Sequence, residues 1–467
     1  MPSVMNQLLV KFITLFGFVL SAFLAFNVLQ LSSCSSDDNG MEYVPSLDIG
    51  DTDSISIDSL IVETEDSTSL SGDTLLTQFV HSLPVIKITI DEKYLWSEDS
   101  GLFVVDHPVQ WEFPSQVIYI EEGDTIFDNA LGLRLKGNSS INLPNRSMGL
   151  YWRKKYGEKL IEYTFFKNYD LNTFKRLKLR NGGTDADQLI TKDAVLSKLM
   201  GALRNVEVAN SRAVEVFIND IYWGIYNLRE LITPRHFQYK YKLDNEQITM
   251  LQSFPQEPQV DDGDANEYLT TVLPFLETQD FSDEAVVDAF FDNYMDKSSF
   301  IDYYAAEIYI GNWDWPANNM KWWKSSESSD QKWQWIAHDL DMALEEKHIE
   351  HMWIGDYYKN TDDVAEHHSP GFFMLNKLME NQQFRIDFFD RFLEIIDHFS
   401  PEHFNAIAEN EMNQILAYYP DHKNKWDYYL SFSEWLTAQE KFKSLNHHRN
   451  EWIKPIIKDF LEYEQNN

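Results

Sequence analysis

The feature that most limits how this chain can fold is a change in the spacing of its apolar residues near Pro234. Before that residue, apolar and polar side chains alternate in short runs, which is typical of half-buried strands. After it, apolar residues recur three and four positions apart, which is typical of helices. Expected strands are residues 85–90, 116–120, 131–136, 174–180, 213–218 and 221–228, and expected helices are residues 189–203, 283–294, 298–310, 372–397 and 404–419. A strand-rich part followed by a helix-rich part predicts an α+β fold with two lobes.

The N-terminus has the pattern of an export signal. Lys11 supplies a positive charge, and residues 12–31 are apolar and uncharged. Small residues then precede Cys34, a pattern similar to the bacterial lipobox, in which the cysteine is lipidated. We therefore predict a lipoprotein signal peptide over residues 1–33 and lipidation of Cys34. The alternative is a transmembrane anchor of similar length.

Cys34 is the only cysteine of the chain, which excludes an internal disulfide and a cysteine-based metal site. Ser35, Ser36, Asp37 and Asp38 follow it, and this resembles the surface-export signal of Bacteroidetes lipoproteins. We expect an outer-membrane lipoprotein, surface-exposed or periplasmic, that is held to the membrane by the lipid on Cys34.

The composition divides the rest of the chain into a tether and a folded domain. Residues 34–82 are rich in Ser, Thr, Asp and Glu and contain no Lys or Arg, so we predict an acidic tether. Residues 83–467 are predicted to form the folded domain, with lobes of about residues 83–231 and 232–467. The formal net charge of −36 disfavours binding to nucleic acid. An enzyme of this charge that handles ATP would need metal ions to bring the phosphates in.

A glycine turn follows one of the expected strands. The alternating run of residues 131–136 ends at Lys136 and continues as Gly137, Asn138, Ser139 and Ser140. Backbone N–H groups and hydroxyls in such a turn can hold a phosphate group. An ordinary hairpin turn is the alternative.

Two acidic motifs lie close together in the second part of the chain. The segment GNWDWPANN carries Asp314, Asn318 and Asn319, and the segment WQWIAHDLDMAL carries Asp339 and Asp341 after an expected strand. Kinases present a substrate-facing carboxylate, a metal-binding amide and a metal-binding carboxylate in this order. The alternative is that these carboxylates only stabilise turns and helix ends.

Taken together, the motifs resemble those of the spore-coat protein H (CotH) kinase family. The matching segments, in the family's order, are LRLKGNSS, LKLRNGGTDADQLITKDAVLSKLM, VEVFINDIYWGIYNLRELI, GNWDWPANN and WQWIAHDLDMAL, and they cover roughly residues 83–350. The resemblance implies an atypical protein-kinase-like fold with a strand-rich N-lobe and a helical C-lobe. It also implies transfer of the γ-phosphate of ATP to Ser or Thr hydroxyls of proteins in the cell envelope, with Mg²⁺ or Mn²⁺.

The same resemblance implies roles for the acidic motifs. Asp314 would be the catalytic acid/base that faces the substrate hydroxyl. Asn319, or less favourably Asn318, would bind the metal together with Asp339, and Asp341 would support the metal site.

A larger set of residues is implied for the nucleotide, lying above its phosphates or near its adenine between the lobes. This set is Lys136, Gly137, Asn138, Ser139, Ser140, Arg146 and Glu230. Arg146 stands where the family usually has a lysine, and its planar head binds phosphate differently from an ammonium group. Lys136 is the other candidate for this phosphate contact. Related folds include members that have lost catalysis or that transfer AMP.

Two other functions are compatible with the sequence. A non-catalytic surface lipoprotein could bind a glycan or an envelope component by stacking sugar rings on its tryptophans, namely Trp313, Trp315, Trp322 and Trp323. A zinc hydrolase could use His348, His351, His367 and His368, but the spacing lacks the HExxH order.

Overall fold

The structure is a computed structural model that describes residues 83–104, 111–137, 139–167, 169–254, 257–316, 318–328, 331–352 and 370–467. All of them belong to one compact unit of the chain, Leu70–Asn467. The predicted signal peptide, Cys34 and the acidic tether lie outside the described residues. No helix of the described part is long and apolar enough to span a bilayer.

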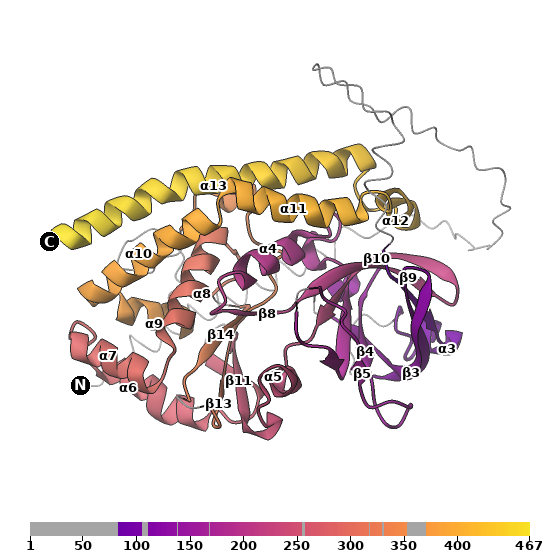
Figure 1. The fold of residues 1–467 in the computed structure, drawn as a ribbon, viewed down its shortest axis with the longest axis horizontal. Helices are drawn as coiled ribbons and strands as arrows, with labels where there is room; N and C mark the ends of the chain where they lie inside the picture. Colours follow the sequence, from indigo (N-terminus) through magenta and orange to yellow (C-terminus); the bar gives the residue numbers. More distant parts are fainter. Residues whose placement is uncertain are drawn as a thin grey trace, which may run out of the picture. The chain divides into compact units, whose positions relative to one another are not determined.

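The first part of the described chain forms a closed seven-stranded barrel (Figure 1). Along each strand, side chains point alternately into the barrel and onto its outer surface, because successive side chains of a strand lie on opposite faces. Pairing is antiparallel except where β1 and β9 close the barrel in parallel. In barrel order the strands are β1 (Val85–Thr89), β2 (Phe113–Glu121), β3 (Asp124–Lys136), β4 (Ser147–Tyr151), β7 (Arg176–Arg180), β10 (Ile221–Glu230) and β9 (Ser211–Ile218).

The hairpin expected between residues 213–218 and 221–228 is confirmed. Asn219 and Asp220 connect β9 and β10 with φ values of 50° and 62°. A two-residue hairpin turn of type I′ requires positive φ at both positions, and asparagine and aspartate tolerate this better than most residues. The turn residues therefore fix the register of this hairpin.

A second sheet has four of its five strands in the part of the chain where the sequence predicts mainly helices, and β8 (Glu207–Val208) comes from the first part. Its strand order is β12 (Glu257–Asp262), β11 (Ile248–Phe254), β13 (Met320–Ser325), β14 (Gln334–Ala337) and β8 (Glu207–Val208). Only β14 corresponds to a strand that the sequence indicates. Trp322 and Trp323 on β13 are both buried, so this strand is covered on both faces and shows no alternation. A two-stranded sheet, β5 (Ile161–Glu162) and β6 (Thr173–Phe174), accompanies the barrel.

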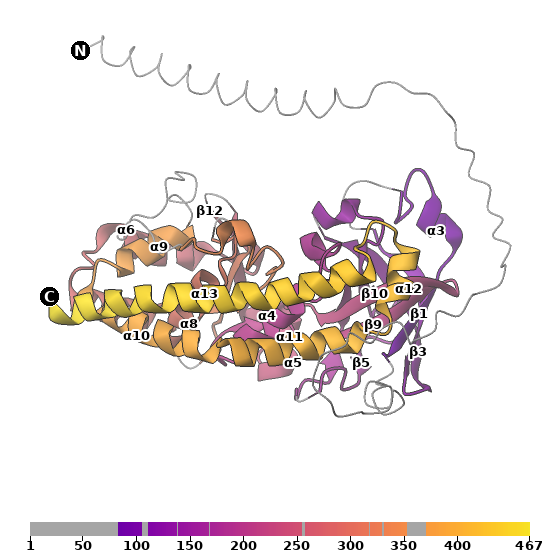
Figure 2. The same ribbon diagram turned by 90° about the horizontal axis from the view of Figure 1, so that it is seen from above.

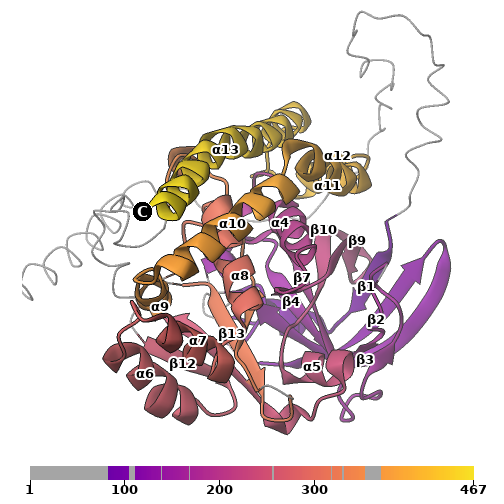
Figure 3. The ribbon, with the colours of Figure 1, turned by 60° about the vertical axis from the view of Figure 1, so that its left-hand side comes forward.

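Helices surround the second sheet, and α8 is the central one (Figure 3). It is buried on almost every side, and Tyr303 stacks on Trp335 of the sheet. The helices of the described part, including α3 and α12 beside the barrel, are α3 (Glu92–Trp96), α4 (Lys192–Gly201), α5 (Pro234–Tyr241), α6 (Leu273–Thr278), α7 (Glu284–Asn293), α8 (Lys297–Ile310), α9 (Pro370–Leu378), α10 (Gln382–His398), α11 (Pro401–Ile415), α12 (Tyr419–Lys425) and α13 (Phe432–Asn466). The α+β fold with a strand-rich first part and a mostly helical second part is confirmed.

The C-terminal helices differ from the prediction in their boundaries. The helix expected over residues 372–397 is divided into α9 and α10, because Asn381 caps the start of α10. α13 has 35 residues, begins with a capping box of Ser431 and Glu434, and runs beside α11 (Figure 2). Next to α13, α12 contacts the barrel: the backbone N–H of Ile225 donates to Nδ1 of His422 over 2.9 Å. The C-terminal helices thus bind both parts of the fold.

Candidate functional site

Asp314 lies in the loop that follows α8, and two neighbouring amides hold its carboxylate. Nδ2 of Asn318 and Nδ2 of Asn319 each donate to one carboxylate oxygen over 2.9 Å. Burial of the half-buried side chain, together with the charge of Asp339, raises the pKa of Asp314 above its usual range. The sequence motif therefore folds back on itself and brings together Asp314, Asn318 and Asn319.

Asp339 and Asp341 follow β14, and Arg180 at the end of β7 bridges them. The guanidinium lies 2.6 Å from Oδ1 of Asp339 and 2.8 Å from Oδ2 of Asp341. The charge of Arg180 holds the pKa of Asp339 well below its usual range. Burial instead raises the pKa of Asp341, which also accepts from the backbone N–H of Thr184 over 2.7 Å.

Arg180 also connects this group to α4. Its Nε lies 2.8 Å from Oδ2 of Asp193, near the start of that helix. Arg229 of β10 pairs with the same carboxylate and donates to Oγ of Ser197 over 2.9 Å. One buried network therefore joins the barrel, α4 and the acidic segment after β14.

The residues beside Asp314 fit a hard divalent cation. Because Nδ2 of Asn319 is used by Asp314 and by the carbonyl oxygen of Asp339 at 3.4 Å, its Oδ1 is left as an available oxygen ligand. The side chain of Asp339 is 43% exposed, whereas that of Asp341 is 5% exposed. Mg²⁺ is typically bound by one or two protein oxygens that substrate phosphates complement. Within the described ranges, no three His, Asp or Glu side chains form a metal-binding group by themselves.

Gly183 allows Asp341 to approach the barrel. Its φ is 73°, and a Cβ atom there would lie 1.9 Å from Oδ2 of Asp341 and 2.5 Å from NH2 of Arg180. The left-handed backbone conformation costs a residue with a Cβ about 1–2 kcal/mol. Gly183 is thus needed both for its backbone angle and for the close contact.

We expect Gly183→Ala to lower the free energy of unfolding by about 2–4 kcal/mol. The new Cβ atom strains the backbone, and it also displaces the Asp341 carboxylate, which then loses hydrogen bonds. Urea unfolding measures this loss. Gly123→Ala is a matched control, since φ of Gly123 is 88° but no described residue beyond its two chain neighbours has an atom within 4 Å of the position that a Cβ atom would take there. Equal losses in both variants would contradict a role for the contact with Asp341.

The outer face of the barrel carries basic side chains near Asp339 and Asp341. Leu177 and Leu179 of β7 point into the barrel core, which leaves Lys178 on the same face as Arg180. Burial, together with the nearby Arg180, lowers the pKa of Lys178 to about 7. Lys178 forms no ion pair with a described residue.

The register places Arg134, Gly149 and Lys178 in one row across β3, β4 and β7.

No sequence motif marks Arg180, Lys178 or Asp193 as site residues. The available signal was the alternation of leucines with basic residues in the segment LKLR, which indicates a basic outer face for β7.

The predicted phosphate-binding turn lies between β3 and β4. Gly137 has a φ of 120°, and Lys136 lies with its Nζ 5.6 Å from the ring centre of Tyr151. A short 3₁₀ helix, Ser139–Asn142, follows, so Ser140 lies in its first turn. Asn138 and the side chain of Ser139 lie outside the described part. Lys136 is on the outer face of the barrel, as a phosphate contact requires.

Arg146 and Glu230 lie elsewhere. Arg146 is buried, and its NH1 donates to the carbonyl oxygen of Leu102 over 2.9 Å. Glu230 is buried, accepts from the backbone and side chain of Asn210 at 2.9 Å, and lies 3.3 Å from His236. These contacts of the two side chains are thus with neighbouring residues, and their predicted roles at the nucleotide stay predictions.

The two alternative functions find little support in the geometry. Trp315, Trp322 and Trp323 are buried and cannot stack on a sugar ring from solvent. Trp313 stacks on His348 with ring centres 3.8 Å apart. His367 and His368 lie outside the described residues.

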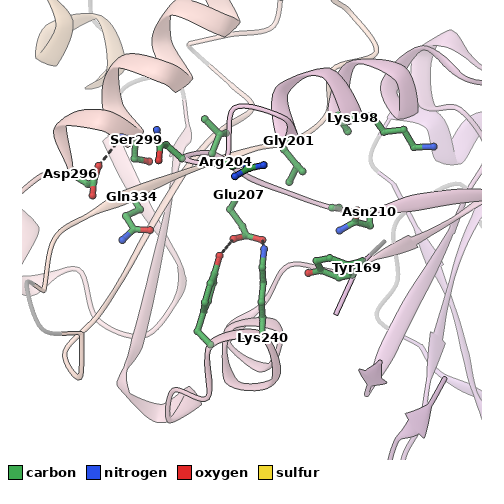
Figure 4. A pocket seen from close by; sticks show the side chains of 16 residues that line it. Tyr169, Lys198, Gly201, Arg204, Glu207, Asn210, Lys240, Asp296, Ser299 and Gln334 are labelled. Atoms are coloured by element: carbon green, nitrogen blue, oxygen red, sulfur yellow. Dashed lines mark hydrogen bonds and ion pairs between the residues drawn. The ribbon is translucent and has the colours of Figure 1, made fainter. Parts of the chain in front are cut away.

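A cavity of about 650 Å³ lies apart from the predicted site residues, none of which lines it (Figure 4). Glu207 points into it and is bound by Lys240 at 2.6 Å and by the hydroxyl of Tyr241 at 2.7 Å. Its wall includes Ser197, whose hydroxyl donates to Asp193 over 3.1 Å. The cavity is thus adjacent to the buried network but does not contain the acidic group.

Comparisons with known proteins point to one family. Residues 133–453 match the family model described as CotH kinase protein. This match identifies the two-part α+β architecture as kinase-like. The crystal structure of the Helicobacter pylori proinflammatory kinase CtkA is similar at 11% identity, covering 66% of this chain and 94% of that chain. Its TM-score of 0.28 is too low to establish a shared fold. No curated protein matches the chain.

Proposed function

Since the chain belongs to the CotH kinase family, we propose that it transfers the γ-phosphate of ATP to Ser or Thr hydroxyls of proteins in the cell envelope. The observation that carries this proposal is that Nδ2 of Asn318 and Nδ2 of Asn319 both donate to the Asp314 carboxylate. Oδ1 of Asn319 is therefore available as a ligand, and Nδ2 of the same side chain lies 3.4 Å from the backbone carbonyl oxygen of Asp339, so the base and the two candidate metal-binding residues are neighbours. Phosphoryl transfer needs mainly this positioning and charge neutralisation.

In the proposed reaction, Asp314 accepts the proton of the acceptor hydroxyl. Burial and the charge of Asp339 raise its pKa, which makes it a better base than a solvated aspartate. Asn319 and Asp339 would hold Mg²⁺ or Mn²⁺, which neutralises phosphate charge when bound. Arg180 fixes the orientation of Asp339. Lys178 and Lys136 on the outer face of the barrel are the candidates to bind the phosphates, in place of Arg146.

We also propose that the protein is a lipoprotein of the outer membrane, anchored through Cys34. The support comes from the apolar run, the lipobox-like residues and the acidic residues that follow. Fatty-acid labelling of the expressed protein tests this assignment. Labelling that persists in Cys34→Ala would contradict it.

The phosphotransfer proposal is tested with ATP labelled at either the γ- or the α-phosphate, in the presence of Mn²⁺ and envelope proteins. We expect the γ-label to appear on Ser or Thr of an acceptor. Transfer of the α-label would instead indicate AMP transfer at the same site. If neither label is transferred to any envelope protein, the proposal is wrong and a non-catalytic role takes its place.

A further inference from the structure

Glu307 is a buried acid that the proposed reaction does not use. It lies in the last turn of α8 and is completely buried. Its Oε2 accepts from Nδ2 of Asn312 over 3.1 Å, and its Oε1 has no hydrogen-bond partner among the described residues. Glutamate is almost never fully buried without a cationic partner, so this position needs an explanation.

The contact of Glu307 leads directly to the predicted catalytic residue. Oδ1 of Asn312 accepts from the backbone N–H of Asp314 over 3.3 Å, and Asn312 is itself fully buried. The hydroxyl of Tyr303, one turn earlier on α8, lies 3.5 Å from the carbonyl oxygen of Asn319. The second half of α8 therefore supports the loop that holds the Asp314 carboxylate at its start, through Asn312, and at its end, through Tyr303.

The charged groups around Glu307 do not compensate an ionised carboxylate. Arg449 of α13 uses its guanidinium on the carbonyl oxygens of Ile308 and Tyr309. His348 stacks on Trp313 instead. Burial, opposed only by the Asn312 hydrogen bond, raises the pKa of Glu307 to about 8.

We propose that Glu307 is a positioning residue, whose uncharged form holds Asn312 and thereby the Asp314 loop, and whose ionisation loosens that loop. The role of Asp314 in this inference rests on the proposed function, but the protonation of Glu307 does not. An ionised carboxylate in this apolar surrounding would have to gain water or move, because no cation among the described residues pairs with it. The loop is then expected to lose its fixed geometry at alkaline pH.

The first test measures protonation without any activity. For the full chain, the unfolding equilibrium of the wild type is compared with that of Glu307→Gln between pH 5 and 9. The folded wild type keeps a proton that the unfolded chain releases above its ordinary pKa of 4.5, so its stability falls as pH rises toward about 8. We expect the unfolding constant of the wild type to rise relative to the variant by up to about tenfold per pH unit.

The second test uses the transfer reaction. We expect the wild-type kcat to fall on the alkaline side, and Glu307→Gln to remove this fall while keeping the neutral-pH rate, because glutamine offers the same acceptor to Asn312 without ionising. Asn312→Ala should lower kcat with little change in the KM for ATP. Parallel pH dependences of stability in wild type and Glu307→Gln would overturn the inference. A difference in stability without any transfer activity would instead count only against the proposed function.

Discussion

Replacing Asp314 by asparagine is expected to lower the rate of phosphoryl transfer by about 10²–10⁴-fold, the usual contribution of a general base. Asparagine keeps the shape of the side chain but cannot accept the proton of the acceptor hydroxyl. It also replaces one of the two oxygens that now accept from Asn318 and Asn319. Binding of metal–ATP should change much less, because the candidate metal ligands Asn319 and Asp339 remain.

The measurement is the initial rate of γ-phosphate transfer, together with the affinity for Mn²⁺–ATP from a separate titration. Asp220→Asn is a matched control, because Asp220 lies in the β9–β10 turn with a side chain that is 89% exposed. Asparagine also tolerates the positive φ of that position. If Asp314→Asn retains the rate of the control, another group is the base.

The sequence was most informative where the interacting residues are close along the chain. Asp314, Asn318 and Asn319 lie within six residues of each other, so one loop brings them together. The β9–β10 hairpin was equally local, since Asn219 and Asp220 alone define its turn. Alternation and turn chemistry are sufficient for such features.

Contacts between distant residues could not be predicted in the same way. Arg180 is 159 positions from Asp339, and no local pattern shows that this arginine contacts the acidic group. The side-chain hydrogen bond of Arg146 to the carbonyl oxygen of Leu102 is likewise a contact between residues 44 positions apart, which no local pattern indicates. The sequence does not predict β13, because this strand is buried on both faces and lacks the alternation of a half-buried strand.

Replacing Asp339 by asparagine is expected to abolish most of the stabilisation that Mn²⁺–ATP gives to the protein. Asparagine tolerates the φ of 61° at this position, so the backbone can stay in place. At a nucleotide concentration about 100 times its dissociation constant, the ligand stabilises the folded wild type by about 2.7 kcal/mol. If loss of the carboxylate charge weakens binding about 100-fold, only about 0.4 kcal/mol of this stabilisation remains. Thermal unfolding with and without Mn²⁺–ATP measures the difference.

Comparison of Asp341→Asn with Asp339→Asn distinguishes a carboxylate that binds the metal from one that stabilises the fold. Asp341 is buried against Arg180 and the Thr184 backbone, so this change should lower the stability of the ligand-free protein, by up to about 3 kcal/mol. Asp339→Asn should cost less without ligand, since Arg180 keeps its bonds to Asp193 and Asp341. A full ligand-induced rise in Asp339→Asn would show that Asp339 is not the metal ligand. A loss of that rise only in Asp341→Asn would assign metal binding to the buried carboxylate, and the site would have to open before nucleotide binds.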